Sequence, residues 1–405
     1  MRTIDNIKSE FPILSQSKHG TALVYLDSAA SAQKPKCVID GMSKFTETSY
    51  ANVHRGLYHL SQQSTYEFEK ARGRVSLFLH AKNPKEIVFT RSLTEGINLL
   101  AQAFVKPMLG IGDEVLVSGM EHHSNLVPWQ MICEESGAKL KIIPVLQNGE
   151  LDMNVYSSQL SSKTKVVSVA HVSNVLGTIN PIKKIVQLAH EKNIPVIVDG
   201  AQAAPHIPVN VQDLDCDFYL ITGHKLYGPT GTGAIFGKFN LWEAMKPYHG
   251  GGEMVEEVSY EKSTFKEPPA RFEAGTPNIV GAIGLGYAVE FVQSIGMEQI
   301  QAHEKELFEY ARKKMNIIPG IRFIGDAKEK IGLISFVIDK FHPADVAAIL
   351  DQQAIAVRVG HHCAQPLHKQ FGVTGSIRIC FGVYNTREDV DRFMEGIEKA
   401  MGMLQ

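Results

Sequence analysis

The sequence predicts an α/β fold in which a large domain contains a mainly parallel β-sheet and a smaller C-terminal domain is α+β. Short β-rich runs alternate with helical patterns through most of the chain. Several of these runs are apolar at consecutive positions, as expected for parallel strands that helices cover on both faces. A change in sequence character after about residue 260 indicates the second domain.

The β-rich runs lie at 86–90 (EIVFT), 114–119 (EVLVSG), 165–172 (KVVSVAHV) and 194–200 (IPVIVDG). Residues 181–193 predict a helix between the last two runs, because their apolar residues recur at helical spacing and form one face. Pro181 suits the first turn of that helix. We therefore expect strand–helix–strand units, which place successive strands parallel to one another.

The stretch after residue 260 is charged and contains prolines, and a glycine-rich apolar helical pattern, IVGAIGLGYAVEFVQSIG, follows it. We interpret this stretch as a connection between domains. The remaining residues alternate helical patterns (EKELFEYARKKM) with strand patterns (IGLISFVID, GSIRICFG). This alternation is typical of a smaller α+β domain of roughly 110 residues.

The composition is that of a globular protein without a polyanionic partner. The chain has 405 residues, of which 44% are hydrophobic and 21% charged, with 41 basic and 43 acidic residues and no basic stripe. No run reaches the roughly 18 apolar residues of a membrane span, and the N-terminus lacks a signal-peptide core. We expect a cytoplasmic protein that binds neither nucleic acid nor membrane.

The cysteines argue against a disulfide framework and a structural zinc site, because they are few, odd in number and never in C-x-x-C spacing. They are Cys37, Cys133, Cys216, Cys363 and Cys380. The glycines of GPTGTGAIFG resemble a dinucleotide fingerprint, but a strand-like segment follows them where a helix is required. We therefore do not expect a nucleotide site.

Lys225 lies at the end of an apolar strand, in FYLITGHKLYGPTG. Ligands of open α/β sheets bind at this edge, where a lysine of lowered pKa forms a Schiff base with a carbonyl; the alternative is a solvated loop lysine. Asp199 ends another apolar strand, with Gln202 three residues further on. Its carboxylate suits a pyridinium N–H, or else it caps the next helix.

An anion site is predicted at the start of RSLTEGINLLAQAF, where Ser92, Thr94 and free amides begin an amphipathic helix. Ordinary helix capping by the same residues is the alternative. His122 and His123 follow the strand EVLVSGM and either stack on a flat cofactor or fill a polar edge.

Six motifs, in this order, resemble those of the pyridoxal-phosphate cysteine desulfurases, in particular the SufS-type (group II) branch with its selenocysteine lyases. They are MEHHSNLVPWQ, HVSNVLG, VDGAQA, GHKLYGPTG, RFEAGTPN and RVGHHCAQPL. The resemblance extends from LDSAASAQKP near residue 26 to YNTREDVDRF near residue 393. It implies the pyridoxal-phosphate-dependent fold-type I, which is aspartate aminotransferase-like.

The resemblance implies that Lys225 forms the Schiff base with pyridoxal 5'-phosphate. The other residues implied to contact the cofactor are Asp199 at the pyridine nitrogen, Gln202 at the ring hydroxyl, His122 stacked on the ring, Asn174 near the ring, and Thr94, Thr222 and His224 at the phosphate. Thr276 is implied to reach the phosphate from the partner subunit, so we expect a homodimer. No metal is expected.

For the substrate, the resemblance implies that Arg378 binds the carboxylate with a bidentate guanidinium. Cys363 would attack the sulfur of L-cysteine as a thiolate and keep it as a persulfide, so that alanine leaves. Arg358 is a supporting residue that either positions the substrate or orders the loop. The chain departs from the family pattern at SLTE, where GTTE is frequent, and at CAQPL, where CAMPL is usual.

The expected domains are an N-terminal segment (1–20) that packs with the small domain, a large cofactor-binding domain (21–290) and a small domain (291–405) with the cysteine loop. A sulfur-acceptor protein of SufE or SufU type is the implied partner, for iron-sulfur cluster assembly. His342 is a candidate contact for the SufU type, or else a surface helix cap.

Three rival functions remain at this point. Selenocysteine lyase, with L-selenocysteine as substrate, and cysteine sulfinate desulfinase would use the same residues as cysteine desulfurase. A metal-binding carrier or scaffold is the rival from another class, and it would use the histidines around Cys363 and those at 122–123. That function leaves Lys225 and Asp199 unexplained.

Overall fold

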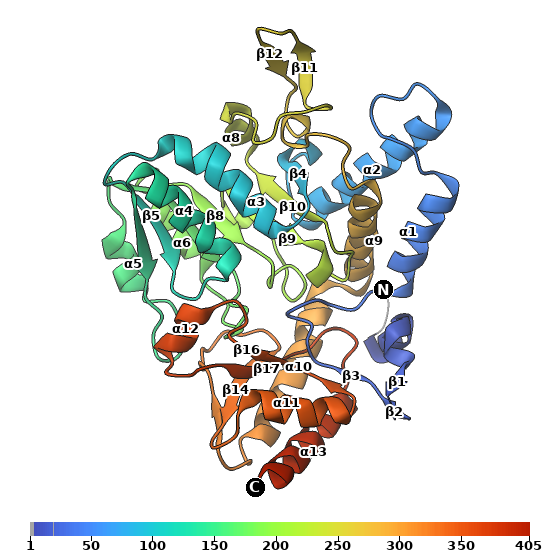
Figure 1. Cartoon of the computed structure of the whole chain (residues 1–405), viewed down its shortest axis with the longest axis vertical. Coiled ribbons are helices and arrows are strands. Elements are labelled where there is room, and N and C mark those ends of the chain that lie inside the picture. The colour runs from blue at the N-terminus through green and yellow to red at the C-terminus, as the bar shows by residue number, and fades with distance from the viewer. Residues whose placement is uncertain (1–3, 19) are drawn as a thin grey trace.

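A seven-stranded sheet forms the centre of the upper domain in Figure 1. The computed structural model describes residues 4–18 and 20–405. In sheet order the strands are β4 (Ile87–Thr90), β10 (Gly233–Gly237), β9 (Phe218–Thr222), β8 (Val196–Asp199), β7 (Thr164–Ala170), β5 (Glu114–Ser118) and β6 (Lys139–Ile143). Only β10 pairs antiparallel with its neighbours. The predicted mainly parallel sheet is confirmed, and the four predicted strands form β4, β5, β7 and β8.

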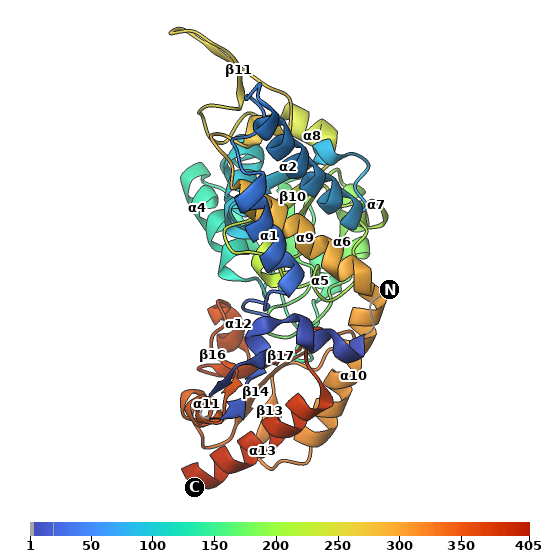
Figure 2. The same ribbon diagram turned by 90° about the vertical axis from the view of Figure 1, so that its right-hand side faces the viewer.

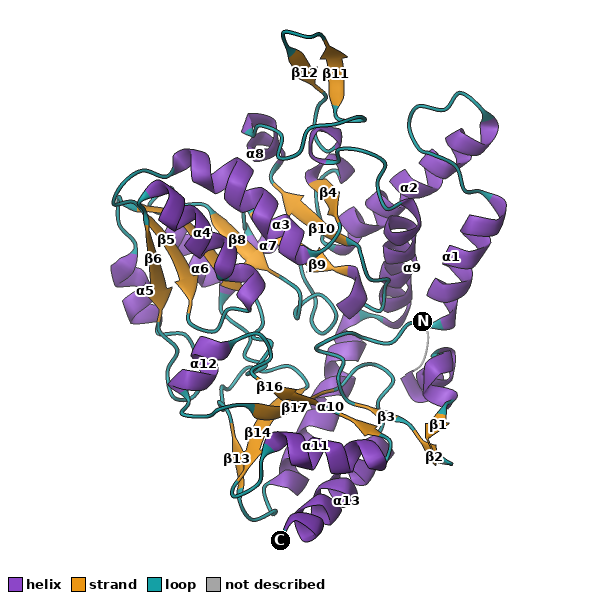
Figure 3. Cartoon of the chain, in the orientation of Figure 1, coloured by secondary structure: helices purple, strands orange, loops and turns teal. Residues whose placement is uncertain are grey.

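Helices cover both faces of this sheet (Figure 3). On one face pack α3 (Leu93–Leu100), α4 (Val127–Ser136) and α8 (Phe239–Ala244). On the other face pack α2 (His59–Phe78), α6 (Ile182–His190) and α9 (Ile279–Ile295), with α1 (Lys36–Thr48), α5 (Met153–Gln159) and α7 (Val211–Leu214) joining the same side. Pro181 precedes α6 as its N-terminal cap rather than lying in its first turn.

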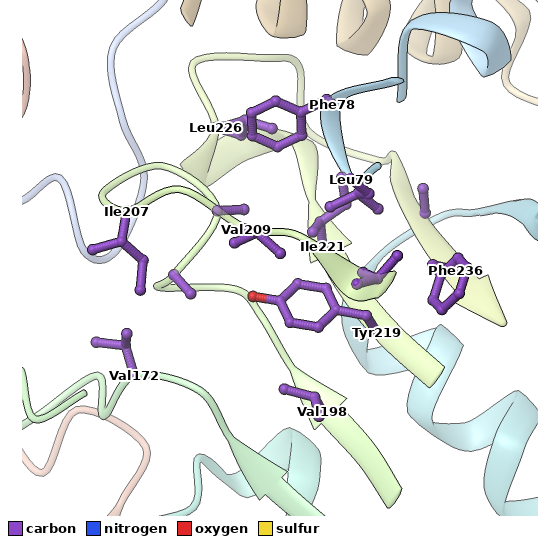
Figure 4. Close-up of a cluster of buried hydrophobic side chains, with 14 of the residues drawn as sticks. Phe78, Leu79, Val172, Val198, Ile207, Val209, Tyr219, Ile221, Leu226 and Phe236 are labelled. Atoms are coloured by element: carbon purple, nitrogen blue, oxygen red, sulfur yellow. The ribbon is translucent and has the colours of Figure 1, made fainter. Parts of the chain in front are cut away.

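Consecutive apolar residues in the strands serve these two faces alternately. In β9, Phe218 and Leu220 pack toward α3 and α8, whereas Tyr219 and Ile221 pack toward α2. Figure 4 shows the α2 side, where Tyr219 lies among Val198, Ile221 and other buried side chains. Because side chains of a strand point to opposite faces in turn, a strand covered on both sides needs no polar position.

The lower domain contains an antiparallel sheet in the order β13 (Ile321–Phe323), β14 (Leu333–Ile338), β17 (Ser376–Cys380) and β16 (Arg358–Gly360). Its helices are α10 (Met297–Met315), α11 (Pro343–Gln352), α12 (Gln365–Gln370) and α13 (Arg387–Leu404). Buried residues of α10, α11 and α13 form a separate core with this sheet. The α+β character predicted for the C-terminal part is therefore observed.

The charged stretch after residue 260 is not the connection between the domains, contrary to the prediction. Its first residues belong to a hairpin of β11 (Val255–Val258) and β12 (Ser263–Phe265), which projects from the far end of the upper domain in both views (Figure 1, Figure 2). The rest of the stretch leads into α9. Helix α9 then packs on α1 and α2 of the upper domain. The chain passes to the lower domain at Gly296, where α9 and α10 meet at a bend of 74°.

The N-terminal segment lies against both domains. Phe11 is buried with its ring against Tyr227 and Phe291 of the upper domain and against Tyr384 of the lower one. Strand β3 (Val24–Tyr25) pairs in parallel with β15 (Ile355–Ala356), while β1 (Ser17–Lys18) and β2 (Thr21–Ala22) form a small hairpin. This arrangement brings Asp27 to the boundary between the domains, where its backbone forms an isolated parallel β-bridge with that of Cys380 in β17.

Among the described residues, no single helix has the length and apolar composition of a membrane span. Helices α9 and α10 meet that criterion only when they are taken together across their bend.

Candidate active site

A cavity of about 280 Å³ opens at the carboxyl ends of the parallel strands, where the upper domain faces β16 and β17. Eleven of the twelve predicted site residues line it, from segments that are far apart in the sequence. They are Thr94, His122, Asn174, Asp199, Gln202, Thr222, His224, Lys225, Arg358, Cys363 and Arg378. The location agrees with the rule that ligands of open α/β sheets bind at this edge.

Lys225 lies in a single 3₁₀ turn, η7 (Gly223–Lys225), directly after β9. Burial lowers the pKa of its ammonium, Asp199 opposes this effect, and Arg378 adds to it. A lysine with a lowered pKa has a larger neutral fraction, and only the neutral amine attacks a carbonyl or accepts a proton. The alternative that Lys225 is a solvated loop lysine is therefore wrong.

Asp199 ends β8 and is buried, and one of its carboxylate oxygens accepts a hydrogen bond of 2.8 Å from the N–H of Ala201. Burial raises the pKa of Asp199, while Lys225 and the Ala201 N–H oppose that shift. Gln202 is also buried, and its Nε2 donates to the carbonyl of Ala29 at 2.7 Å. Its Oε1 has no hydrogen-bond partner, so the site holds a buried acceptor without a donor.

The N-terminus of α3 lines the cavity with the residues Ser92 to Thr94. Ser92 caps the helix by accepting from the N–H of Glu95 at 3.1 Å, so the predicted capping alternative holds for Ser92. The hydroxyl of Thr94 pairs with that of Ser124 at 2.7 Å, and both residues line the cavity. Together with Thr222 and His224, they surround a helix N-terminus that favours anions.

His122 is neutral and oriented by its neighbours. Burial, together with the positive charge of Lys225, lowers the pKa of His122 to about 3. Its Nδ1 accepts from the N–H of Ser124 at 3.0 Å, so the proton of the neutral ring resides on Nε2. The residue before it, Glu121, is buried and accepts from the N–H of Ala170 at 2.9 Å and from Asn125 at 2.6 Å. These bonds fix the His122 segment against β7.

Cys363 is the exposed cysteine of the site, on the four-residue connection between β16 and α12. Its φ of 56° and that of His362, 49°, are both in the left-handed region, which costs free energy for residues other than glycine. Two hydrogen bonds to the upper domain hold this conformation. The N–H of His123 donates to the Cys363 carbonyl at 2.8 Å, and Asn174 Nδ2 donates to the His362 carbonyl at 2.6 Å.

Arg378 is buried in β17, and its Nη1 donates to the carbonyl of Asn174 at 2.9 Å. Arg358 lies opposite it in β16 and is exposed. Asp27 contacts both arginines, at 3.3 Å from Arg378 Nη2 and at 3.0 Å from Arg358 Nη2. Both arginines line the cavity, so their guanidinium groups add positive charge to its wall.

Comparison with known proteins agrees with this geometry. The aminotransferase class-V family model matches residues 24–393. The chain belongs to this family. A probable cysteine desulfurase of Vibrio cholerae is 47% identical over 404 residues, covering all of both chains. The resemblance inferred from the six motifs is therefore confirmed.

Solved structures of this aminotransferase class-V group agree in fold. The cysteine desulfurase CsdA from Escherichia coli superimposes with a TM-score of 0.93 at 38% identity, covering all of both chains. A cysteine desulfurase from Thermococcus onnurineus superimposes with a TM-score of 0.94 at 35% identity, covering 99% of each chain. The predicted fold-type I architecture is confirmed.

Thr276 is the predicted site residue of this class-V chain that does not line the cavity. It is exposed and borders a different cavity of about 340 Å³, with Thr232 and Asn278. Its assignment to the site depended on a partner subunit, and that assignment stays a prediction. His342 caps α11 by accepting from the N–H of Ala344 at 3.2 Å, which is the capping alternative.

The four remaining cysteines differ from Cys363 in their exposure. Cys133, Cys216 and Cys380 are buried, and Cys37 is partly buried. Within residues 4–18 and 20–405, the histidines, cysteines and acidic residues form no group of three that could hold a metal ion. The metal-binding carrier therefore has no ligand set in the described structure.

Two residues of the site, Ser124 and Asp27, were missed by sequence reasoning. Ser124 is in the quoted motif MEHHSNLVPWQ, and a pairing of two hydroxyls 30 positions apart leaves no mark on local sequence. Asp27 lies in LDSAASAQKP and meets its arginines only through the fold. His362 also lines the cavity, and burial together with Arg378 lowers its pKa to about 2, so its ring is neutral and adds no positive charge beside Cys363.

Proposed function

We propose that the chain is a cysteine desulfurase that converts L-cysteine to L-alanine and keeps the sulfur on Cys363 as a persulfide. The observation that carries the proposal is the presence of Lys225, Arg378 and Cys363 on one cavity. They supply an amine of lowered pKa, a cation for a carboxylate and an accessible thiol. Full-length relatives named cysteine desulfurases support it.

The cavity residues fit pyridoxal 5'-phosphate. The orphaned acceptor of Gln202 suits the ring hydroxyl, the buried carboxylate of Asp199 suits a pyridinium N–H, and the α3 N-terminus suits the phosphate. Asn174 and His122 would lie beside the ring, and Thr94, Thr222 and His224 would hold the phosphate. When bound, this cofactor withdraws electrons from the substrate Cα and Cβ.

Each protein group has a task in the proposed reaction. Arg378 binds the substrate carboxylate through free guanidinium N–H groups, and Arg358 supports it through the shared Asp27. The neutral amine of Lys225 takes the Cα proton. The thiolate of Cys363 attacks the substrate sulfur, so that an S–S bond forms while the Cβ–S bond breaks. The electron pair of that bond stays on Cβ, which takes a proton. Lys225 returns its proton to Cα, and alanine leaves.

We further propose a cytoplasmic homodimer in which Thr276 reaches the phosphate of the partner subunit's site. The exposed persulfide would pass to a sulfur-acceptor protein of SufE or SufU type, for iron-sulfur cluster assembly. Exposure of Cys363 supports delivery to a protein, because a partner can approach the thiol without opening the core.

The test is turnover of L-cysteine with L-alanine and sulfide both quantified in the presence of a reductant. Equal amounts of the two products are expected. L-selenocysteine and L-cysteine sulfinate serve as parallel substrates, with selenide and sulfite measured. Absence of alanine from L-cysteine, or sulfite release that greatly exceeds sulfide release, would contradict the proposal.

A further inference from the structure

Behind Cys363, two buried histidines share one serine hydroxyl. His368 Nδ1 lies 3.1 Å from the carbonyl of Ala364, and its Nε2 lies 3.0 Å from Ser376 Oγ. His362 Nε2 lies 3.0 Å from the same Oγ. His368 and Ser376 are fully buried, and His362 is nearly so while also lining the active-site cavity. We call this chain of groups the imidazole relay.

The hydrogen bonds of the imidazole relay can run in only one direction if both rings are neutral. A carbonyl only accepts, so His368 Nδ1 carries the proton and its Nε2 is an acceptor. Ser376 must then donate its single hydroxyl proton to His368. His362 Nε2 must in turn donate to Ser376, which leaves His362 Nδ1 unprotonated.

The surroundings keep both rings neutral. Burial lowers the pKa of His362 to about 2, and Arg378, His368 and Arg358 add to the effect. Burial also lowers the pKa of His368. A positive imidazole here would be a further charge in a site that already has two guanidinium groups and one nearby carboxylate, Asp27.

Two unpartnered groups remain, and they are complementary. His362 Nδ1 is buried without a donor, and Arg378 Nε is buried without an acceptor. Ser376 and Arg378 are two residues apart in β17, so their side chains leave the same face of the sheet. Asn174 contacts both residues, since it donates to the His362 carbonyl and accepts from Arg378 Nη1. The residues that carry the two orphaned groups are therefore neighbours, and the charge of Arg378 acts on the His362 ring.

We infer that His362 is a positioning residue whose Nδ1 accepts from Arg378 Nε–H, directly or through one water, and thereby orients the guanidinium that binds the substrate carboxylate. The inference rests on the proposed function, because it assigns that carboxylate to Arg378. It gives the imidazole relay a role: Ser376 and His368 keep the proton off the nitrogen that faces the arginine. It also joins carboxylate binding to the loop of Cys363, since His362 precedes the thiol.

The test compares the affinities of the holoenzyme for two amines, L-alanine, which has a carboxylate, and ethylamine, which has none. Binding is followed by the absorbance of the cofactor. His362→Gln keeps a donor for Ser376 but removes the acceptor near Arg378. We expect L-alanine affinity to fall about tenfold, the value of one hydrogen bond to a charged group, with ethylamine affinity unchanged. His362→Asn places an amide oxygen near the former Nδ1, and should recover part of the loss.

A second variant and a structural readout guard against misfolding. Ser376→Ala breaks the imidazole relay while the His362 side chain itself is kept, and it should also lower the affinity for L-alanine. Ser64→Ala is the matched control, because it also removes a buried hydroxyl, bonded at 2.8 Å to the Ala51 carbonyl far from the cavity. In ¹⁵N-histidine NMR of the cofactor-free protein, His362 should be the Nε2–H tautomer and His368 the Nδ1–H tautomer.

The inference would be overturned if His362→Gln lowered the affinity for both amines equally, or left both affinities unchanged. A His362 ring protonated on Nδ1 at neutral pH would also overturn it. Failure of the proposed function is distinguishable from this outcome. In that case the unmodified enzyme would release no alanine from L-cysteine, whatever the variants do.

Discussion

The N–H of His123 donates a hydrogen bond of 2.8 Å to the main-chain carbonyl of Cys363. It ties the loop of the exposed thiol to the segment that carries His122, although the two lie on different domains. Asn174 anchors the preceding carbonyl, that of His362, in the same way. Cys363 belongs to the lower domain, but these two hydrogen bonds from the upper domain help to fix the position of its thiol.

Cys363→Ala should retain the cofactor absorbance of the native enzyme and still bind L-cysteine, because the thiol acts only on the substrate sulfur. Alanine formation from L-cysteine should fall to background. The measurement is alanine by amino-acid analysis, with Cys133→Ala as the control for loss of a thiol. Normal alanine release by Cys363→Ala would show that this thiol is not the nucleophile.

Lys225→Ala should abolish covalent attachment of the cofactor after borohydride reduction and all alanine formation. Mass spectrometry of the reduced protein checks this result. Lys330→Ala is a matched control, since burial lowers the pKa of Lys330 to about 8 but the residue lies outside the cavity. A cofactor adduct that persists in Lys225→Ala would contradict the assignment.

The sheet and much of the site could be predicted from the sequence because their signals are local. Apolar runs define β8 and β9, and a residue at the end of such a run, Asp199 or Lys225, must lie at the carboxyl edge. Every strand of the parallel set contributes its end to the same edge. Local patterns therefore predicted a shared location before any contact was known.

The interdomain features could not be predicted in the same way. Asp27 precedes its arginine partners by more than 300 positions, and no periodicity links them. The charged stretch after residue 260 resembles a linker in composition, but its first residues pair with β11 in a hairpin. His362 is buried and Cys363 is exposed, and both have a left-handed backbone conformation. The side chains of these two residues give no sign of this conformation in the sequence.

Asp27→Asn tests the residue that sequence reasoning missed. Loss of the carboxylate charge leaves Arg378 and Arg358 without their shared anion, so their guanidinium groups should be oriented less well. We expect the KM for L-cysteine to rise about tenfold, the effect of losing charged hydrogen bonds, with a smaller change in kcat. Asp40→Asn is the control, because Asp40 pairs with Lys36 on the exposed surface. An unchanged KM in Asp27→Asn would remove Asp27 from substrate binding.

A buried ion pair between the domains should make stability depend on pH. His206 Nδ1 lies 2.7 Å from Glu304 Oε2 of α10, and both side chains are buried. Burial alone would lower the pKa of His206, but the charge of Glu304 and the nearby Cys380 raise it to about 10. Burial also raises the pKa of Glu304, so the pair is lost at low pH when this carboxyl is protonated. Because the pKa of His206 exceeds the unfolded value of about 6.5, the stabilisation from its charge is present at pH 6.5 and is lost as pH rises toward 10.

Glu304→Gln should therefore lower the free energy of unfolding by about 3 kcal/mol at pH 6.5, the scale for breaking a buried pair. The difference between this variant and the native protein should shrink as pH approaches 10. Urea unfolding followed at several pH values provides the measurement. A difference that grows with pH would mean that His206 is neutral in the folded protein.

Turnover with L-cysteine alone should be slow, and an acceptor protein or a strong reductant should accelerate it. The connection that carries Cys363 has only the four residues 361–364 between β16 and α12. Two of its carbonyls are bonded to the upper domain. A persulfide on such a loop cannot swing out to a distant partner, so a partner must approach the site and collect the sulfur.

Unloading of Cys363 is therefore expected to limit the rate when no acceptor is present, as product release does in many enzymes. The experiment measures alanine formation with L-cysteine alone, with reductant, and with acceptors of the SufE and SufU types. Cys363→Ala with acceptor is the control, and it should form no alanine. If L-cysteine alone already gave the rate reached with every acceptor and with reductant, unloading would not be limiting. In that case the anchored loop would have to release its sulfur without a partner.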